Sequence, residues 1–384
     1  MKYQEHFLLD CDEVISYVKE KNLFSENADL IAKEIGDGNI NYIFKVENKI
    51  DGKSIVLKQA DKLLRSSGRP LDLTRSKIEA NILKIENNLA PHFVPEIYFY
   101  DEIMCVLAME DISEYKNLRT ELVAGKIFPN FADNISEFLS RTLLLTTDLF
   151  MDKFEKKKNV KEFINPELCD ISECLVFTEP YNNNRNRNVI TSGNEEFVKN
   201  TLYENEDLHF AILKLREKFM NYSQALIHGD LHSGSIFINE KGIKIIDPEF
   251  SFYGPMAYDI GNVIGNLYFP LYRAKFFMEE SKEKEEFINW LEKTIFNIPI
   301  LFSKKCKLLW EKYSNEKLLK NNKFMNYYIE NIIEDSLAYA GTEIIRRTVG
   351  DAKVLELTSL ENSEKKLQLE KKLINKAISM IMKN

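Results

Sequence analysis

Three carboxylates occupy two short motifs in the second half of the chain. Asp230 lies in H-G-D-L-H, and Asp247 and Glu249 lie in D-P-E. Apolar runs that predict short strands flank both motifs: Ala225–Ile227, Ile236–Ile238 and Ile243–Ile246. In phosphoryl transfer, one carboxylate orients the attacking hydroxyl group and others hold a divalent cation against the phosphates. Any one of these residues alone would be interpreted as a solvated turn residue, but the ordered pair of motifs favours phosphotransfer chemistry.

The composition is that of an ordinary globular protein, with 384 residues, 44% hydrophobic and 29% charged. This length is enough for two domains, each with its own core. The net charge of −8 argues against nucleic acid as the main partner. No apolar run is long enough to span a membrane, and the first residues do not resemble a signal peptide. The five cysteines form no C-x-x-C pair, which predicts reduced thiols in the cytoplasm and no zinc site.

The first third of the chain alternates between apolar and polar residues and predicts a small β-sheet. A strand–turn–strand segment over Ile35–Val46 contains Gly36 and Gly38. Such a turn lets backbone N–H groups approach a phosphate, although a simple hairpin turn is the alternative. The next predicted strand, Ser54–Gln59, carries Lys58 within an apolar run. A half-buried lysine needs an anionic partner, and otherwise it would lie at an edge facing solvent.

Helical spacing over Leu73–Leu89 supplies that partner. Glu79 on this helix is the predicted ion-pair partner of the strand lysine, with Glu86 as the alternative. The loop before the helix, Arg65–Pro70, is basic and rich in small residues, and we predict it to be mobile.

Two further predicted strands, Val94–Tyr100 and Ile103–Met109, end at Glu110, Asp111 and Ile112. The two acidic residues are either a solvated strand end or, given the neighbouring motifs, part of a hinge whose backbone contacts a nucleobase.

The rest of the chain is predicted to be mainly helical. After D-P-E, a break at Gly254-Pro255 precedes a predicted helix over Tyr258–Leu267. Asp259, near its start, is predicted as an N-cap. A resemblance to kinase-like folds implies a second, compatible role as an acceptor for the backbone of the H-G-D-L-H loop. Farther on, the predicted helix Asp335–Val349 contains two adjacent arginines, Arg346-Arg347. Adjacent guanidinium groups in an apolar helix favour an anionic or hydroxyl-rich ligand.

These motifs together resemble the 5-methylthioribose kinase family, within the superfamily of aminoglycoside, choline and homoserine phosphotransferases. The matching stretches, in chain order, begin at Ile35, Leu57, Met109, Asn165, Leu175, His228, Ile246 and Glu343. Ser235 stands where members of the superfamily usually have a metal-binding asparagine, and D-P-E with Glu249 is typical of this family. The chain departs from the family at Arg69-Pro70, where a tryptophan usually precedes the proline of a closing loop. That difference leaves the packing of the lid and the substrate preference open, and it does not involve the phosphotransfer residues.

The resemblance implies an α+β, two-lobed, protein-kinase-like fold. Residues 1–112 would form an N-lobe with a small antiparallel sheet, and residues 113–384 a mainly helical C-lobe. It also implies a cytoplasmic homodimer that uses ATP and Mg²⁺ to phosphorylate the 1-hydroxyl group of methylthioribose, a step of methionine salvage. A kinase of another small hydroxyl compound and a nucleotide-binding pseudokinase are the alternatives. The pseudokinase would lack at least one of Lys58, Asp230 and Asp247, and all three are present.

The resemblance also implies a role for each matched residue. Asp230 would be the catalytic residue, and Asp247 and Glu249 the metal ligands. Arg346 and Arg347, together with Asp230, would contact the sugar. The residues implied for ATP binding are Asn39, Asn41, Lys58, Glu79, Glu110, Asp111, Ile112, Asp247, Pro248 and Glu249.

Overall fold

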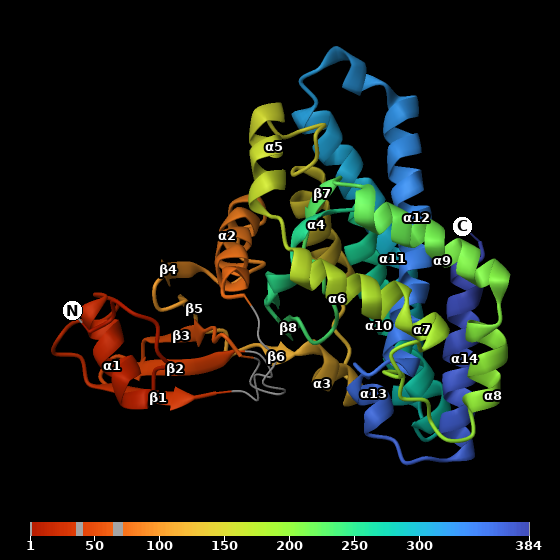
Figure 1. Cartoon of the computed structure of the whole chain (residues 1–384), viewed down its shortest axis with the longest axis horizontal. Coiled ribbons are helices and arrows are strands. Elements are labelled where there is room, and N and C mark those ends of the chain that lie inside the picture. Colours follow the sequence, from red (N-terminus) through yellow and green to blue (C-terminus); the bar gives the residue numbers. More distant parts are fainter. Residues whose placement is uncertain (1, 36–40, 64–71, 384) are drawn as a thin grey trace. The chain divides into compact units, whose positions relative to one another are not determined.

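The computed structural model describes residues 2–35, 41–63 and 72–383, which form two compact units (Figure 1). The first unit comprises Met1–Glu114 and Lys244–Glu249, and the second comprises Tyr115–Ile243 and Phe250–Asn384. A small antiparallel sheet in the first unit and a mainly helical second unit confirm the predicted α+β class. The predicted boundary after residue 112 assigned Lys244–Glu249 to the helical part, whereas this segment belongs to the first unit.

The sheet of the first unit has the strand order β1-β2-β3-β5-β4, and all neighbours are antiparallel. Its strands are β1 (Leu30–Glu34), β2 (Tyr42–Asn48), β3 (Ser54–Gln59), β4 (Ile97–Asp101) and β5 (Val106–Glu110). The predicted phosphate-approaching turn with Gly36, Gly38 and Asn39 lies outside the described residues, as does the loop with Arg69.

Helix α1 (Cys11–Glu20) covers one face of this sheet. Its buried residues Val14, Tyr17 and Val18 join the core formed by Leu57 of β3 and other strand residues. Because side chains alternate along a strand, the neighbouring residue Lys58 points to the opposite face. Helix α2 (Thr74–Leu89) contacts β4 and β5 and carries the partner of that lysine.

The second unit is built around long helices. Its helices are α3 (Leu118–Val123), α4 (Phe131–Leu144), α5 (Lys153–Glu162), α6 (Pro166–Phe177), α7 (Glu179–Asn182), α8 (Glu195–Val198), α9 (Glu206–Asn221), α10 (Met256–Phe277), α11 (Lys282–Tyr313), α12 (Asn322–Val349), α13 (Leu355–Thr358) and α14 (Glu364–Ile381). Its short strands are β6 (Lys116–Asn117), β7 (Ala225–Ile227), β8 (Ile236–Asn239) and β10 (Phe252–Gly254), and β9 (Gly242–Ile245) leads into the first unit. Strand β7 pairs with β10, and β8 pairs with β6, both antiparallel.

Helices α10 and α12 pack closely in the second unit (Figure 1). Two glycines of α10 make this approach possible, because a Cβ atom on Gly261 would lie 2.7 Å from the Ser336 carbonyl oxygen. One on Gly265 would lie 2.8 Å from the Ala340 carbonyl oxygen. The close packing brings polar residues of both helices together beside the H-G-D-L-H loop.

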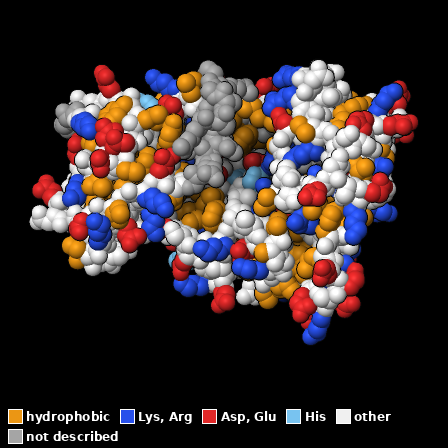
Figure 2. All heavy atoms as spheres, turned by 90° about the horizontal axis from the view of Figure 1, so that it is seen from below, with side chains coloured by type: hydrophobic (Ala, Val, Ile, Leu, Met, Phe, Trp, Pro, Cys, Tyr) orange, Lys and Arg blue, Asp and Glu red, His pale blue; other side chains and the backbone are white. Residues whose placement is uncertain are grey.

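No helix in the described part of the chain is long and apolar enough to cross a membrane. Lysine, arginine, aspartate and glutamate side chains are interspersed over the face in Figure 2, without one large patch of a single sign.

Candidate active site

Lys58 is a buried cation in the first unit, paired with Leu107 of β5 and Ile43 of β2 in the sheet. Its Nζ lies 2.8 Å from Oε1 of Glu79, so the predicted ion pair is present. It also contacts a carboxylate oxygen of Asp247. Burial alone would lower the pKa of the Lys58 ammonium group, but the surrounding carboxylates raise it above its ordinary value. The lysine is therefore charged and held in one place.

The carboxylates around this lysine repel one another. Burial raises the pKa of Glu249 to about 7, with a further contribution from Glu79 and Asp247 that Lys58 opposes. Arg75 at the start of α2 adds a second cation, with its Nε 3.7 Å from Oε2 of Glu249. Within this described group, three carboxylates face two cations, so a divalent cation would offset the surplus negative charge. The donor set thus fits a hard cation such as Mg²⁺.

Asp247 has a left-handed backbone conformation, with φ of +62°. For a residue other than glycine, this conformation is uncommon and costs on the order of 1 kcal/mol. Aspartate and asparagine adopt it more readily than other side chains do. The conformation at this position therefore suits an aspartate or an asparagine.

The predicted hinge residues have side chains that fix the end of β5. The Glu110 carboxylate binds Lys244 Nζ at 2.7 Å, and the Glu110 N–H donates to the Glu96 carbonyl group at 2.8 Å. Burial opposes the charge of Asp111, but hydrogen bonds, foremost from Lys45, lower its pKa to about 2. A nucleobase contact at Glu110 would therefore use the main-chain carbonyl group. Ile112 follows, partly exposed and outside any strand.

Arg75 also explains the position of Asn41. Its guanidinium group donates to Oδ1 of Asn41 at 3.2 Å and to the carbonyl groups of Asp61 and Asp72. Our sequence reasoning missed this arginine. The available signal was its place in the first turn of a helix, where a cation opposes the helix dipole and needs anionic or carbonyl partners.

In the second unit, Asp259 holds the loop that carries Asp230. Its carboxylate accepts hydrogen bonds from the backbone N–H groups of His228 at 2.7 Å and Gly229 at 3.0 Å, as predicted. The N-cap interpretation is wrong, because α10 begins at Met256 and Asp259 lies within its first turn. Gly229 has φ of +84°, and a Cβ atom there would lie 2.3 Å from a backbone oxygen, so the loop requires glycine.

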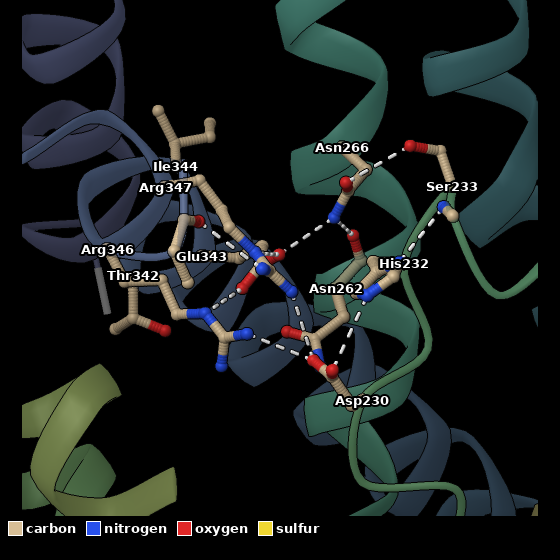
Figure 3. Close-up of polar contacts among 12 residues, drawn as sticks. Asp230, His232, Ser233, Asn262, Asn266, Thr342, Glu343, Ile344, Arg346 and Arg347 are labelled. Carbon is tan, nitrogen blue, oxygen red and sulfur yellow. Dashed lines mark hydrogen bonds and ion pairs between the residues drawn. The ribbon is translucent and has the colours of Figure 1, made fainter. Parts of the chain in front are cut away.

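Asp230 is bound by three side chains (Figure 3). Its Oδ1 accepts from the terminal nitrogens of Arg346 at 3.0 Å and Arg347 at 3.1 Å, and Nε2 of His232 lies 3.4 Å from Oδ2. Burial alone would raise the pKa of Asp230, but the histidine and the two guanidinium groups hold it well below its ordinary value. The carboxylate is ionised at neutral pH and can orient a hydroxyl group.

The hydrogen bonds of His232 determine its tautomer. The backbone N–H of Gly234 donates to Nδ1 at 2.9 Å, so the ring proton lies on Nε2 and points toward Asp230. Burial, together with nearby Arg347 and Arg119, lowers the pKa of His232 to about 4 although Asp230 opposes the shift. The histidine is therefore a neutral donor.

This shift predicts a pH-dependent stability. Between pH 6.5 and 4 the unfolded chain binds a proton at His232 and the folded chain does not, so the free energy of unfolding falls as the pH falls. We expect the wild type to lose on the order of 2 kcal/mol more than His232→Gln between pH 7 and 4.5, because glutamine retains an N–H donor and does not titrate. Urea unfolding at both pH values measures the difference. An equal fall in the free energy of unfolding for the two proteins would contradict the lowered pKa of His232.

The structure thus gathers the predicted residues into two groups. Asn41, Lys58, Glu79, Glu110, Asp111, Ile112, Asp247, Pro248 and Glu249 belong to the first unit, and Asp230, Arg346 and Arg347 belong to the second. Asn39 lies outside the described residues. Our sequence reasoning also missed Glu343, which forms ion pairs with Arg346 and Arg347. Its spacing of three and four residues from the arginines was the available signal.

Comparison with known proteins assigns the class. The model of a phosphotransferase enzyme family matches residues 164–283. A solved structure of choline kinase from Cryptosporidium parvum Iowa II has a TM-score of 0.51 and 15% identity, covering 97% of this chain and 94% of that chain. At that identity the likeness shows the fold alone. Over residues 164–283 the chain is thus similar to phosphotransferases.

Two curated relatives are more similar in sequence. The methylthioribose kinase of Geobacillus sp. strain WCH70 is 36% identical over 96% of this chain and 90% of its own length. That of Escherichia coli O45:K1 strain S88 is 38% identical over 91% of this chain and 86% of its own length. The chain is a kinase and belongs to the methylthioribose kinase family, which confirms the predicted resemblance.

Proposed function

We propose that this kinase transfers the γ-phosphoryl group of ATP to the 1-hydroxyl group of 5-methylthioribose. The products would be ADP and 5-methylthioribose 1-phosphate, an intermediate of methionine salvage. The observation that carries the proposal is the partly buried Asp230 carboxylate with Arg346 and Arg347 on one oxygen, in a chain of this family. Such a group suits a neutral, hydroxyl-rich acceptor.

The first unit supplies the nucleotide ligands in this proposal. Lys58, held by Glu79, binds the α- and β-phosphates, as a buried and permanently charged lysine can. The main chain of Glu110–Ile112 receives the adenine edge. Asn41, directly before β2, contacts the nucleotide. Asn39, which lies outside the described residues, is a further proposed contact.

Asp247 and Glu249 are the proposed Mg²⁺ ligands, with Pro248 between them. Magnesium is usually bound by one or two carboxylates together with phosphate oxygens and water, and this pair fits that pattern. When bound, the cation neutralises charge on the phosphates. The surplus of carboxylates around Lys58 supports this assignment.

The second unit supplies the acceptor ligands. Asp230 accepts a hydrogen bond from the 1-hydroxyl group and takes up its proton as the new O–P bond forms. Arg346 and Arg347 bind hydroxyl groups of the sugar. An aminoglycoside or choline kinase is the second candidate, but its cationic acceptor would find no surplus negative charge here, because Asp230 and Glu343 are already paired with the two guanidinium groups.

A side-by-side acceptor assay tests this proposal. We expect kcat/KM for methylthioribose to exceed that for choline and for an aminoglycoside by at least ~10²-fold, because the paired carboxylates leave no surplus negative charge to bind a cation. An ADP-coupled assay measures the rates, and ³¹P NMR of the product locates the phosphate on carbon 1. A higher value for either cation would overturn the assignment of the substrate.

The assembly and location are further parts of the proposal. The family resemblance implies a homodimer, so light scattering is expected to give about twice the chain mass of 44.9 kDa. Five free thiols at Cys11, Cys105, Cys169, Cys174 and Cys306 support a reducing compartment, the cytoplasm.

A further inference from the structure

Glu343 is a completely buried carboxylate on α12, and each of its oxygens faces one of the two arginines (Figure 3). Its Oε1 lies 2.9 Å from Nε of Arg347, and its Oε2 lies 3.0 Å from Nε of Arg346. Burial alone would raise the pKa of Glu343, but the two guanidinium groups lower it below its ordinary value. The residue is thus a fixed negative charge behind the arginine pair.

Each guanidinium group spans two carboxylates. The Nε atoms of Arg346 and Arg347 face Glu343, and their terminal nitrogens reach Oδ1 of Asp230. Arg347 donates a hydrogen bond to each carboxylate, so its planar guanidinium group cannot rotate without losing one of them. Arg346 donates to Asp230 and forms an ion pair with Glu343. Two positive and two negative charges therefore form a balanced group in which Glu343 determines how the arginines meet Asp230.

The position of Glu343 is itself fixed by α10. Asn266 Nδ2 donates to Oε1 of Glu343 at 2.9 Å, and its Oδ1 accepts from Arg119 at 3.0 Å. The close approach of the two helices at Gly265 places these residues side by side. Arg119 in turn donates to Ser233 in the loop after Asp230 at 3.1 Å. The carboxylate is therefore held by the scaffold and not by the arginines alone.

The two carboxylate oxygens of Asp230 have different contacts. Oδ1 receives both arginines, whereas Oδ2 has a single, longer contact with His232 among the described residues. Each carboxylate oxygen has room for about two donors, so Oδ2 retains capacity for one more. A hydroxyl group that binds there would not compete with a guanidinium group.

We propose that Glu343 is a positioning residue that holds Arg346 and Arg347 on Oδ1 of Asp230, so that Oδ2 receives the acceptor hydroxyl group. This inference rests on the proposed role of Asp230. It assigns no contact between Glu343 and the substrate.

Glu343→Gln tests the proposal, because the amide keeps the size of the side chain and removes its charge. We expect kcat for the acceptor to fall by ~10²-fold, since small displacements of a catalytic group have effects of this size. The KM for ATP is expected to change less than about threefold, because the proposed ATP ligands belong to the other unit. Glu343→Asp, which restores the charge, is expected to recover about a tenth of the wild-type kcat.

Glu334→Gln on the exposed side of α12 is the matched control and should behave as the wild type. All rates are normalised to the sites that bind ATP, so that a loss of folded protein does not count as a loss of turnover. Should Glu343→Gln fail to fold, Glu343→Asp replaces it as the test. Its shorter side chain moves the negative charge away from the arginines, so kcat should still be about a tenth of the wild-type value. A wild-type kcat in the variant would overturn the proposal. So would a KM for ATP that rises by the same factor by which kcat falls. The identity of the acceptor is settled separately with the wild type, and the variants are then compared with whichever acceptor it uses.

Discussion

Asp230→Ala is expected to lower kcat by at least ~10³-fold, because it removes the group that orients and deprotonates the attacking hydroxyl. The loss should appear in kcat and not in ATP affinity, since Asp230 belongs to the second unit and the proposed ATP ligands to the first. An ADP-coupled assay gives kcat, and titration calorimetry gives the Kd for ATP. We expect that Kd to change less than about threefold.

Alanine also leaves Arg346 and Arg347 without one of their anionic partners, so part of any effect is structural. Asp230→Asn separates the two contributions. The asparagine oxygen can still accept from the arginines, while the side chain can no longer take up a proton. We therefore expect Asp230→Asn to lose activity as fully as alanine does but to unfold closer to the wild-type temperature. Asp170→Asn on the exposed side of α6 is the control. Turnover retained in Asp230→Asn would assign proton transfer to another group.

Local pattern was sufficient to predict the first half of the site. A lysine within the apolar strand β3 needs an anion, and the helix that follows offered only two glutamates on its length. The structure pairs Lys58 with Glu79 at 2.8 Å. Strand alternation decided the face of the sheet, and helical spacing limited the choice of partner. The contact of Asp259 with the loop was predicted from the resemblance to kinase-like folds, because the two lie about 30 residues apart and no local pattern joins them.

Local pattern could not predict that Lys244–Glu249 belongs to the first unit. Its contacts are made with residues far away in the sequence, such as Lys244 with Glu110. Alternation indicates which face of a strand is buried but not which distant strand end will lie beside it. The predicted boundary therefore separated Asp247 from Lys58, although the two side chains are in contact.

The residues around Asp230 were predictable only in part from the sequence. The spacing of Glu343 from the two arginines is a local helical signal, and it was available in the sequence. Asn266 has no such signal, because its contact with Glu343 depends on how closely α10 and α12 pack. Tertiary packing of this kind determines which buried polar groups meet, and a single sequence shows only that each of them needs a partner.

Asp247→Asn is expected to raise the Mg²⁺ concentration needed for half-maximal activity by at least ~10-fold. It should also lower kcat by roughly 10³-fold, because stabilisation by a bound metal is worth several kcal/mol. Asparagine is the right substitution here because Asp247 has φ of +62°, which asparagine tolerates and alanine does not. An alanine variant would combine backbone strain with the loss of a ligand. Activity is measured over a Mg²⁺ series at fixed ATP.

The matched control is Asp51→Asn, an exposed aspartate in the β2–β3 turn of the same unit, which should keep the wild-type metal dependence. Lys58 provides a second comparison. Loss of the Asp247 charge leaves Lys58 paired with Glu79, so the lysine remains charged and phosphate binding should persist. The variant should therefore bind ATP without metal about as well as the wild type and differ only when Mg²⁺ is present. An unchanged Mg²⁺ dependence would exclude Asp247 as a ligand and leave it as a partner of Lys58 alone.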